Sequence, residues 1–396
     1  MASDSVRPIP SVIPQGSLHA SASEVEVSRR LRGVVTVLVA VGAWTLLFGL
    51  WIDPQRIGLN LLLNSFYLLT LGLGGICFVA IHYASGASWC IAIRRVPEAM
   101  AGVLPLAAVG LLALFLIYPN LYSWRSGGLE PGSFKAFWLS WPFFVVRSLL
   151  YLSVWLLLTR AILRHSRRQD EDGRFRHTLL NRRLSALFIA VFGVTFWLAS
   201  FDWIMSLEPH WYSTLFAVYN FAGLFLSGLA TITLLAVWLR RAGPFRTTLT
   251  EAHLHDLGKL IFAFSTFWMY IWFSQYMLIW YANISEETIY FVRRARGSWM
   301  PLFILTMILN WAVPFLALLS QRAKKDPVRM AQVSAVILVG RWLDVYLMIF
   351  PAFTAGRIWF GAWEVGMSCG AVGLFLWAVF RSLRAAAPVP IRDPLL

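Results

Sequence analysis

Ten long apolar stretches dominate this chain of 396 residues and constrain its fold more than any other feature. A helix that crosses a bilayer needs about 20 mostly apolar residues. Hydrophobic residues make up 59% of the sequence and charged residues only 13%, whereas a soluble domain carries about a quarter of charged residues. The sequence therefore predicts an all-α integral membrane protein. The predicted spans are 33–51, 60–84, 99–118, 137–159, 184–206, 211–238, 257–281, 299–319, 330–350 and 365–380.

The positions of Lys and Arg predict how these spans are oriented. An even number of spans places both termini on one side of the membrane, and cytoplasmic loops carry an excess of Lys and Arg. The segments on the side of the termini hold 25 of the 34 Lys and Arg residues, and the opposite segments hold seven. Both termini are therefore predicted to be cytoplasmic, with residues 1–30 as a flexible tail, 31–380 as the membrane domain and 381–396 as a second tail.

The formal net charge of +15 follows mainly from this asymmetry. It predicts attraction to anionic lipids and no nucleic-acid partner. Eight arginines fall in 160–183, which we expect to be a cytoplasmic loop that anchors the protein or docks a peripheral partner. The outer segment 284–298 breaks the charge bias with three arginines. It predicts a short interfacial helix capped near Ser285, or a contact with an extracytoplasmic subunit.

Spans two to five and six to nine carry related landmarks and predict an internal repeat. Tyr118-Pro-Asn follows the third span and Tyr281-Ala-Asn follows the seventh. A Trp-Leu pair and an aspartate mark the fifth span, at Asp202, and the ninth, at Asp344. Because a shift of four helices preserves direction, the repeat is parallel. We expect two four-helix bundles, 60–206 and 211–350, flanked by the first and last spans.

Ionisable side chains inside apolar stretches are unfavourable unless they pair, face water or move protons. Asp202, Glu208 and His210 stand between the fifth and sixth spans and predict an outer limb of a proton path. Arg147, placed near the middle of the fourth span, requires a partner or water. Arg341 and Asp344 are three residues apart, so they can pair on one helical face. Arg147 and this pair are further candidates for the proton path, where we expect them to tune the pKa values of its acids. The alternative interpretation is that such buried pairs serve structure alone.

The seventh span supplies matching groups at its inner end. His255, Asp256 and Lys259 predict an inner entry for protons. Farther along the same helix, Gln275 and Tyr276 are candidates for binding a quinone head group. His82 on the second span is a third quinone candidate, although a structural histidine is the simpler interpretation.

Bound cofactors other than a quinone are not expected. Cys77, Cys90 and Cys369 form no C-x-x-C pair, which argues against an iron–sulfur cluster or covalently attached haem. Only His82 and His210 lie at or near membrane depth, toward opposite sides, so a b-type haem with two axial histidines is not predicted. We expect no metal site and no catalytic residue in this chain.

Two segments together resemble a known family. Phe201-Asp-Trp-Ile-Met-Ser-Leu-Glu-Pro-His-Trp-Tyr-Ser-Thr is one, and His253-Leu-His-Asp-Leu-Gly-Lys, followed by 267–283, is the other. They resemble the ActF-type membrane subunits of bacterial alternative complex III, in the wider NrfD and polysulfide-reductase group. Ser285 departs from the proline that the family pattern usually has there. The resemblance covers about residues 30–380.

The resemblance implies a cofactor-free subunit of a quinol-oxidising complex in the bacterial cytoplasmic membrane. Its implied partners are a sister NrfD-like subunit of the ActC type, an iron–sulfur subunit and multihaem c-type cytochromes. Quinone or menaquinone binding and proton conduction through buried acids are the implied roles. A secondary transporter of a small solute and a passive scaffold for the redox subunits are the competing hypotheses.

Overall fold

The structure is a computed structural model that describes residues 27–127, 129–246, 248–354, 356–387, 389–390 and 392–393. Within these residues, ten helical segments are long and apolar enough to cross a membrane, so the ten predicted spans are confirmed. They are α2 (Arg29–Ile52), α3 (Pro54–Ser85), the segment Ile91–Ile117 that ends in α5 (Leu104–Ile117), α7 (Trp141–Asp172), α8 (Phe175–Trp203), α9 (Phe216–Ala242), α10 (Glu251–Ala282), the segment Gly297–Ala317, α15 (Pro327–Ile349) and α16 (Ala362–Arg384).

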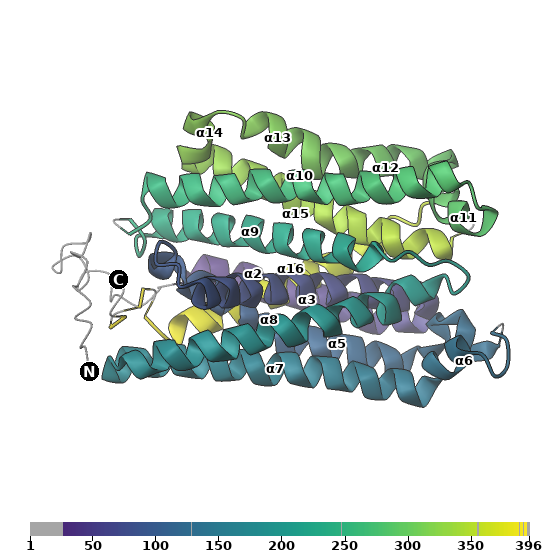
Figure 1. Ribbon diagram of the computed structural model, residues 1–396, viewed down its shortest axis with the longest axis horizontal. Helices are drawn as coiled ribbons and strands as arrows, with labels where there is room; N and C mark the ends of the chain where they lie inside the picture. The colour runs from purple at the N-terminus through teal and green to yellow at the C-terminus, as the bar shows by residue number, and fades with distance from the viewer. Residues whose placement is uncertain are drawn as a thin grey trace, which may run out of the picture.

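The spans lie roughly along one axis of the molecule (Figure 1). We call the end where α2 begins and α16 ends the inner end, after the predicted orientation, and the opposite end the outer end. Three shorter helices join the spans: α14 (Gln321–Lys325) at the inner end, and α6 (Phe134–Trp138) and α11 (Ser285–Arg294) at the outer end. Helix α4 (Arg95–Met100) is the inner part of the third span, Ile91–Ile117. The molecule is a multi-pass helical membrane protein, whereas its orientation in the membrane stays a prediction.

Helices α3 and α9 form the centre of the bundle. Every residue of the most apolar part of α3 is buried, and so is most of the equivalent part of α9. Helix α3 packs on α5 and α8, which lie in the lower half of Figure 1, and α9 packs on α10 and α15 in the upper half. The predicted bundles 60–206 and 211–350 thus have comparable packing partners, and the parallel repeat itself remains a prediction.

The two central helices touch at a pair of glycines. A Cβ atom built on Gly74 would lie 2.9 Å from the Cα atom of Gly228, and a Cβ on Gly228 would lie equally close to Gly74. Contacts this short admit no side chain on either helix. Small residues at such crossings let helix backbones approach closely, which is the usual way that helices pack within a membrane.

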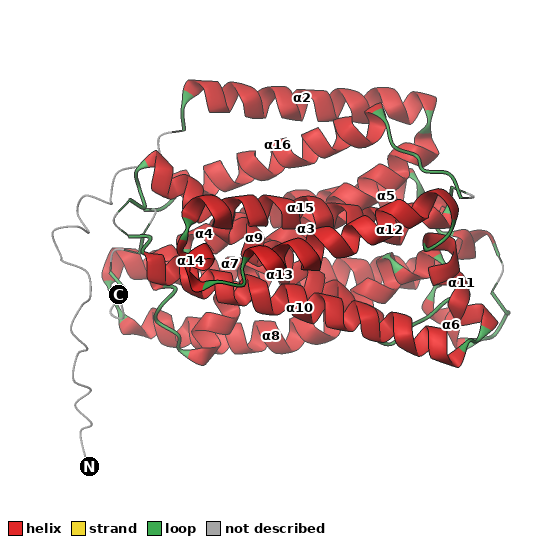
Figure 2. Cartoon of the chain, turned by 90° about the horizontal axis from the view of Figure 1, so that it is seen from above, coloured by secondary structure: helices red, strands yellow, loops and turns green. Residues whose placement is uncertain are grey.

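The first and last spans stand beside this core, as predicted. Helices α2 and α16 pack against each other over much of their length, and α16 also contacts α3 and α4. Figure 2 shows the pair along one side of the molecule. Much of the outward surface of α2 is exposed and apolar, including Trp44, Leu47 and Trp51. Apolar exposure of this kind is what a lipid-facing helix requires.

The prediction that 160–183 is a loop is wrong. Helix α7 continues to Asp172 and α8 begins at Phe175, so only Gly173 and Arg174 connect them. Arginine is a good helix former, and polar residues continue a helix into water without penalty. At 1.5 Å per residue the 32 residues of α7 span roughly 48 Å, more than the hydrocarbon thickness of about 30 Å. The arginines therefore belong to a helical hairpin at the inner end.

The ends of the chain differ partly from expectation. Residues 1–26 of the predicted tail 1–30 lie outside the described residues, and α2 begins at Arg29. At the other terminus, α16 extends to Arg384, so the first residues of the predicted tail 381–396 are helical. The short helix predicted in 284–298 exists as α11, although Ile284 rather than Ser285 is the residue before its first turn.

Candidate functional site

A buried ion pair joins two helices of the first half. Arg147 of α7 donates from Nη2 to Asp202 Oδ1 at 2.8 Å and from Nε to Oδ2 at 3.0 Å. Both side chains are at least 94% buried. Two further donors complete the carboxylate, because Trp138 Nε1 donates to Oδ1 at 2.9 Å and the Tyr151 hydroxyl donates to Oδ2 at 3.1 Å. The predicted partner of Arg147 is thus Asp202.

This carboxylate is saturated with donors. A carboxylate has about four lone-pair sites, and Asp202 accepts four hydrogen bonds. The guanidinium of Arg147 also donates to the Trp138 carbonyl at 2.7 Å and lies 4.1 Å from the centre of the Trp138 ring. Arg147 lies only six residues from the start of α7, roughly 9 Å along the helix. The prediction that it sits near mid-span is therefore wrong, because α7 begins at Trp141 and not at residue 137.

The second half holds the other predicted pair. Arg341 Nη1 donates to Asp344 Oδ2 on the same face of α15, three residues apart as expected. The hydroxyl of Tyr219, from α9, donates to Asp344 Oδ1. Both charged residues are at least 97% buried. Gly223 makes room for the arginine, since a Cβ there would lie 1.8 Å from Arg341 Nη2.

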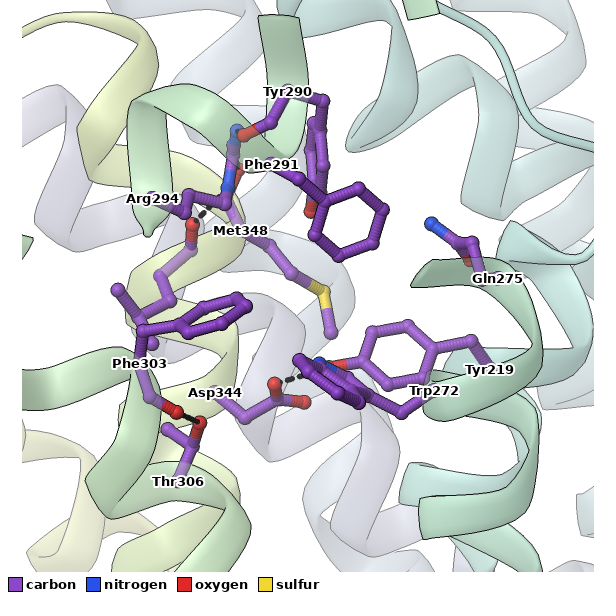
Figure 3. A pocket seen from close by; sticks show the side chains of 11 residues that line it. Tyr219, Trp272, Gln275, Tyr290, Phe291, Arg294, Phe303, Thr306, Asp344 and Met348 are labelled. Carbon is purple, nitrogen blue, oxygen red and sulfur yellow. Dashed lines mark hydrogen bonds between the residues drawn. The ribbon is translucent and has the colours of Figure 1, made fainter. Parts of the chain in front are cut away.

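A small cavity lies beside Asp344 (Figure 3). Its volume is about 20 Å³, comparable to the space that one buried water needs. Asp344 and Tyr219 border it on one side, and Arg294 and Tyr290 of α11 border it on another. Gln275 of α10 faces the same space. The full lining is Tyr219, Trp272, Gln275, Tyr290, Phe291, Arg294, Phe303, Thr306, Asp344, Leu347 and Met348.

Glu208 connects this cavity to the outer end. Its Oε1 accepts from Arg294 Nη2 at 2.7 Å and its Oε2 accepts from Arg293 Nη1 at 2.8 Å. Arg294 also donates to the carbonyls of Leu347 and Met348 on α15. Two of the three arginines that break the charge bias in 284–298 are therefore held by an acid of the same chain. Burial raises the pKa of Tyr290, which stacks under Arg294, so its hydroxyl stays protonated.

The predicted outer limb is divided between two places. Asp202 lies with Arg147 in the first half, and Glu208 lies with α11 beside the second half. His210 is exposed at the outer end. No hydrogen bond among the described side chains joins Asp202 to Glu208 or His210. The three residues are therefore close in sequence but take part in separate groups.

The predicted inner entry is only partly one group. Lys259 Nζ lies 2.6 Å from Asp256 Oδ1, and the two side chains are about half and one-third exposed. His255 is half-buried on the same first turns of α10. These residues lie on the first turns of α10 at the inner end, whereas the Asp344 cavity lies toward the outer end of the bundle.

The three quinone candidates lie at different ends of the molecule. Gln275 lines the cavity beside Asp344, and its Oε1 is buried without a partner among the described residues. Tyr276 does not line it, but stacks on Trp272, which does. His82 borders a separate cavity at the inner end, where its Nδ1 lies 2.7 Å from the Phe78 carbonyl. One quinone cannot contact all three.

The sequence does not predict two buried clusters that the structure contains. At the outer end, Glu364 is fully buried and accepts from Arg56 Nε and Nη2 at 2.7 and 2.6 Å and from Asn60 at 3.0 Å. The predicted spans leave Arg56 in a loop and residue 364 at the edge of a span. One feature could have indicated this ion pair, because Arg56 and Glu364 each lie within one turn of the start of a helix.

The second such cluster lies at the inner end. Glu98 accepts from Arg95 Nη1 at 2.5 Å and from the Ser166 hydroxyl at 2.6 Å. Asp170 of α7 also pairs with Arg95, so the group ties α4 to α7. The sequence shows only Arg-Arg-x-x-Glu, which is a common pattern on exposed helices and carries no sign of burial.

The chain matches no protein-family model and has no significant sequence match to a curated protein. The family resemblance therefore remains a prediction from the two motifs.

Proposed function

We propose that this chain is a cofactor-free membrane subunit of a quinol-oxidising electron-transfer complex and that it conducts or couples protons. The resemblance of the 201–214 and 253–283 segments supports the choice of complex. The buried acids support the proton role, since charges persist inside a membrane protein where they have a function. The redox centres would belong to partner subunits.

The observation that carries the proton role is the position of Asp344. It accepts one hydrogen bond from Arg341 and one from Tyr219, and it borders a cavity with space for a water. A carboxylate with open lone pairs next to water can take up and release a proton. On the far side of the cavity, Arg294 forms an ion pair with Glu208, which lies at the outer end. Asp344, a water and the Arg294–Glu208 pair form the proposed outer part of the path.

Asp202 has a different role in this proposal. Its carboxylate accepts four hydrogen bonds, so an incoming proton would have to displace one of the four donors. We therefore propose that the Arg147–Asp202 pair positions α6, α7 and α8, while Asp344 is the group that moves protons. His255, Asp256 and Lys259 are the proposed inner entry, where Asp256 and Lys259 are partly exposed.

The first test is the partner list. We expect purification in a mild detergent to yield c-type haem and iron–sulfur proteins together with this chain. Recovery of the chain alone, with uptake of a small solute in liposomes, would contradict the proposal and favour a transporter. Assembly with redox partners but unchanged proton stoichiometry after removal of the buried acids would favour a passive scaffold.

The second test measures protons per electron in liposomes that contain the assembled complex. We expect Asp344→Asn to abolish or strongly reduce proton translocation while quinol oxidation continues in the presence of an uncoupler. Asp202→Asn should lower the amount of folded complex but leave the protons per electron of the remaining complex unchanged. The opposite pattern would mean that the roles assigned to the two halves are reversed.

A further inference from the structure

A larger cavity lies at the inner end, away from the path proposed above. It has a volume of about 290 Å³ and lies where α3 ends, between the connection to α4 and the first two turns of α8. Residues 175, 178, 179 and 182 of α8 form one wall, a spacing that places them on one helical face. The opposite wall comes from the last turns of α3 and from 86–94.

One wall of the cavity carries a buried cation. The side chain of Arg94 is only 6% exposed, and its guanidinium lies 4.9 Å from the centre of the Tyr83 ring. Its Nη1 pairs with Asp393 at 2.7 Å and its Nε lies 3.4 Å from Glu98. Nη2 is buried and has no hydrogen-bond partner among the described residues. A buried guanidinium with an unused donor has capacity for a further anionic oxygen.

A second cation lies at the mouth of the cavity. Arg182 is exposed, and its Nη2 would be 3.3 Å from a Cβ atom on Gly86, so its head group lies against the end of α3. His82 borders the same space and donates from Nδ1 to a backbone carbonyl, which leaves Nε2 for other contacts. Burial raises the pKa of the Cys90 thiol to about 12, so this lining residue is neutral.

Much of the remaining lining is apolar, with Phe78, Val79, Ile91, Phe175 and Leu179, whereas Ser85, Thr178 and Asp393 are polar. The cavity thus combines two guanidinium groups, one of them paired with Asp393, with largely apolar walls at the end of the bundle where the bilayer surface is expected. A ligand that matches it carries a negative charge on oxygen and an attached hydrocarbon part. Arginine binds phosphate through charge-assisted, often bidentate hydrogen bonds.

We propose that this cavity binds the phosphate head group of an anionic phospholipid, with Arg94 and Arg182 on the phosphate and the apolar wall against the upper acyl chain. The position fits, because an anionic lipid in the cytoplasmic leaflet presents its phosphate at the level where the basic ends of the helices lie. Because the Asp393 carboxylate already pairs with Nη1 of Arg94, the phosphate would bind Arg94 through its unpartnered Nη2. This inference does not depend on the proposed proton path.

The test compares lipid binding by variants of the full-length protein. Delipidated protein in detergent is titrated with dioleoyl phosphatidylglycerol, with dioleoyl phosphatidylcholine and with inorganic phosphate. Bound lipid is counted by native mass spectrometry, and the Tm is recorded. We expect phosphatidylglycerol to bind and to raise the Tm, phosphatidylcholine to bind more weakly, and inorganic phosphate to have no effect.

Arg182→Gln should weaken phosphatidylglycerol binding by about tenfold, as expected for losing one charge-assisted contact. Arg183→Gln is the matched control, because it removes the same charge from the next residue, which is also exposed and does not line the cavity. Leu179→Trp, which fills the apolar wall, should also weaken binding and leaves both arginines in place.

Three results would overturn the proposal. Equal loss of binding in Arg182→Gln and Arg183→Gln would show that only the surface charge matters. A Tm increase with inorganic phosphate alone would show an anion site without a lipid requirement. A Tm increase with decylubiquinone, and none with phosphatidylglycerol, would assign the cavity and His82 to a quinone.

Discussion

The two halves of the molecule each bury an arginine–aspartate pair, but they bury it differently. Asp202 accepts four hydrogen bonds, including two from Arg147, and these donors come from α6 and α7. Asp344 accepts one from Arg341 and one from Tyr219 and stands beside a cavity. A saturated pair holds helices together, whereas an open one can exchange a proton. Similar residues at related places therefore need not share a role.

The largest expected effect comes from removing one partner of the saturated pair. Arg147→Met leaves the Asp202 carboxylate buried without its cation, and breaking such a pair lowers the free energy of unfolding by about 3–5 kcal/mol. Unfolding in detergent, followed by circular dichroism, measures it. The double variant Arg147→Met with Asp202→Leu should recover much of the loss. A single variant as stable as the wild type would remove the distinction between the halves.

A matched pair of tyrosine variants sharpens the comparison. Tyr219→Phe removes one of the two donors of Asp344, and a hydrogen bond to a charged group is worth about 1.5–3 kcal/mol. Tyr151→Phe removes one of four donors of Asp202 and should cost less, because three donors remain on that carboxylate. Thermal unfolding of the two variants under one condition gives the difference. Equal losses would mean that the number of donors does not distinguish the two carboxylates.

The space around Arg341 gives the next prediction. A Cβ on Gly223 would overlap the guanidinium, so Gly223→Ala should destabilise by about 1–3 kcal/mol, the usual range for overpacking. Gly193→Ala on α8 is the control, because nothing lies within 4 Å of the added atom. Alanine favours a helix over glycine, so the control should be neutral or slightly stabilising. A loss of stability in both variants would point to the helices and not to the arginine.

The smallest loss of stability is expected for a variant of Arg293, at the outer end. Arg293 pairs with Glu208, but its side chain is 36% exposed, so Arg293→Gln should change the stability by less than about 1 kcal/mol. Arg294 is 3% exposed and pairs with the same acid, so Arg294→Gln should lower the stability several times more. Equilibrium unfolding in detergent compares the two. Similar losses would contradict the burial argument.

The spans can be predicted from the sequence because a run of about 20 apolar residues is typical of a helix that crosses a bilayer and rare elsewhere. The pairing of Arg341 with Asp344 is predictable for a similar reason, since residues three apart share a helical face. The partner of Arg147 is not, because it depends on how α7 lies against α8. The burial of Glu364 and Glu98 cannot be predicted from the sequence, because only tertiary packing buries them. The α7–α8 hairpin cannot be predicted from hydropathy either, because an apolar stretch ends where the membrane ends, whereas the helix continues beyond it.

The contact between Gly74 and Gly228 has a mechanical consequence. Backbones that touch cannot slide past each other, because any residue brought to the crossing in place of glycine carries a side chain that does not fit. The close contact between α3 and α9 therefore fixes the position of one half of the molecule against the other. Some transporters expose a site alternately to each side by tilting one half against the other. Such a motion in this protein would first have to separate α3 from α9 at the two glycines. Protons need no such motion, since they can pass along fixed side chains and water.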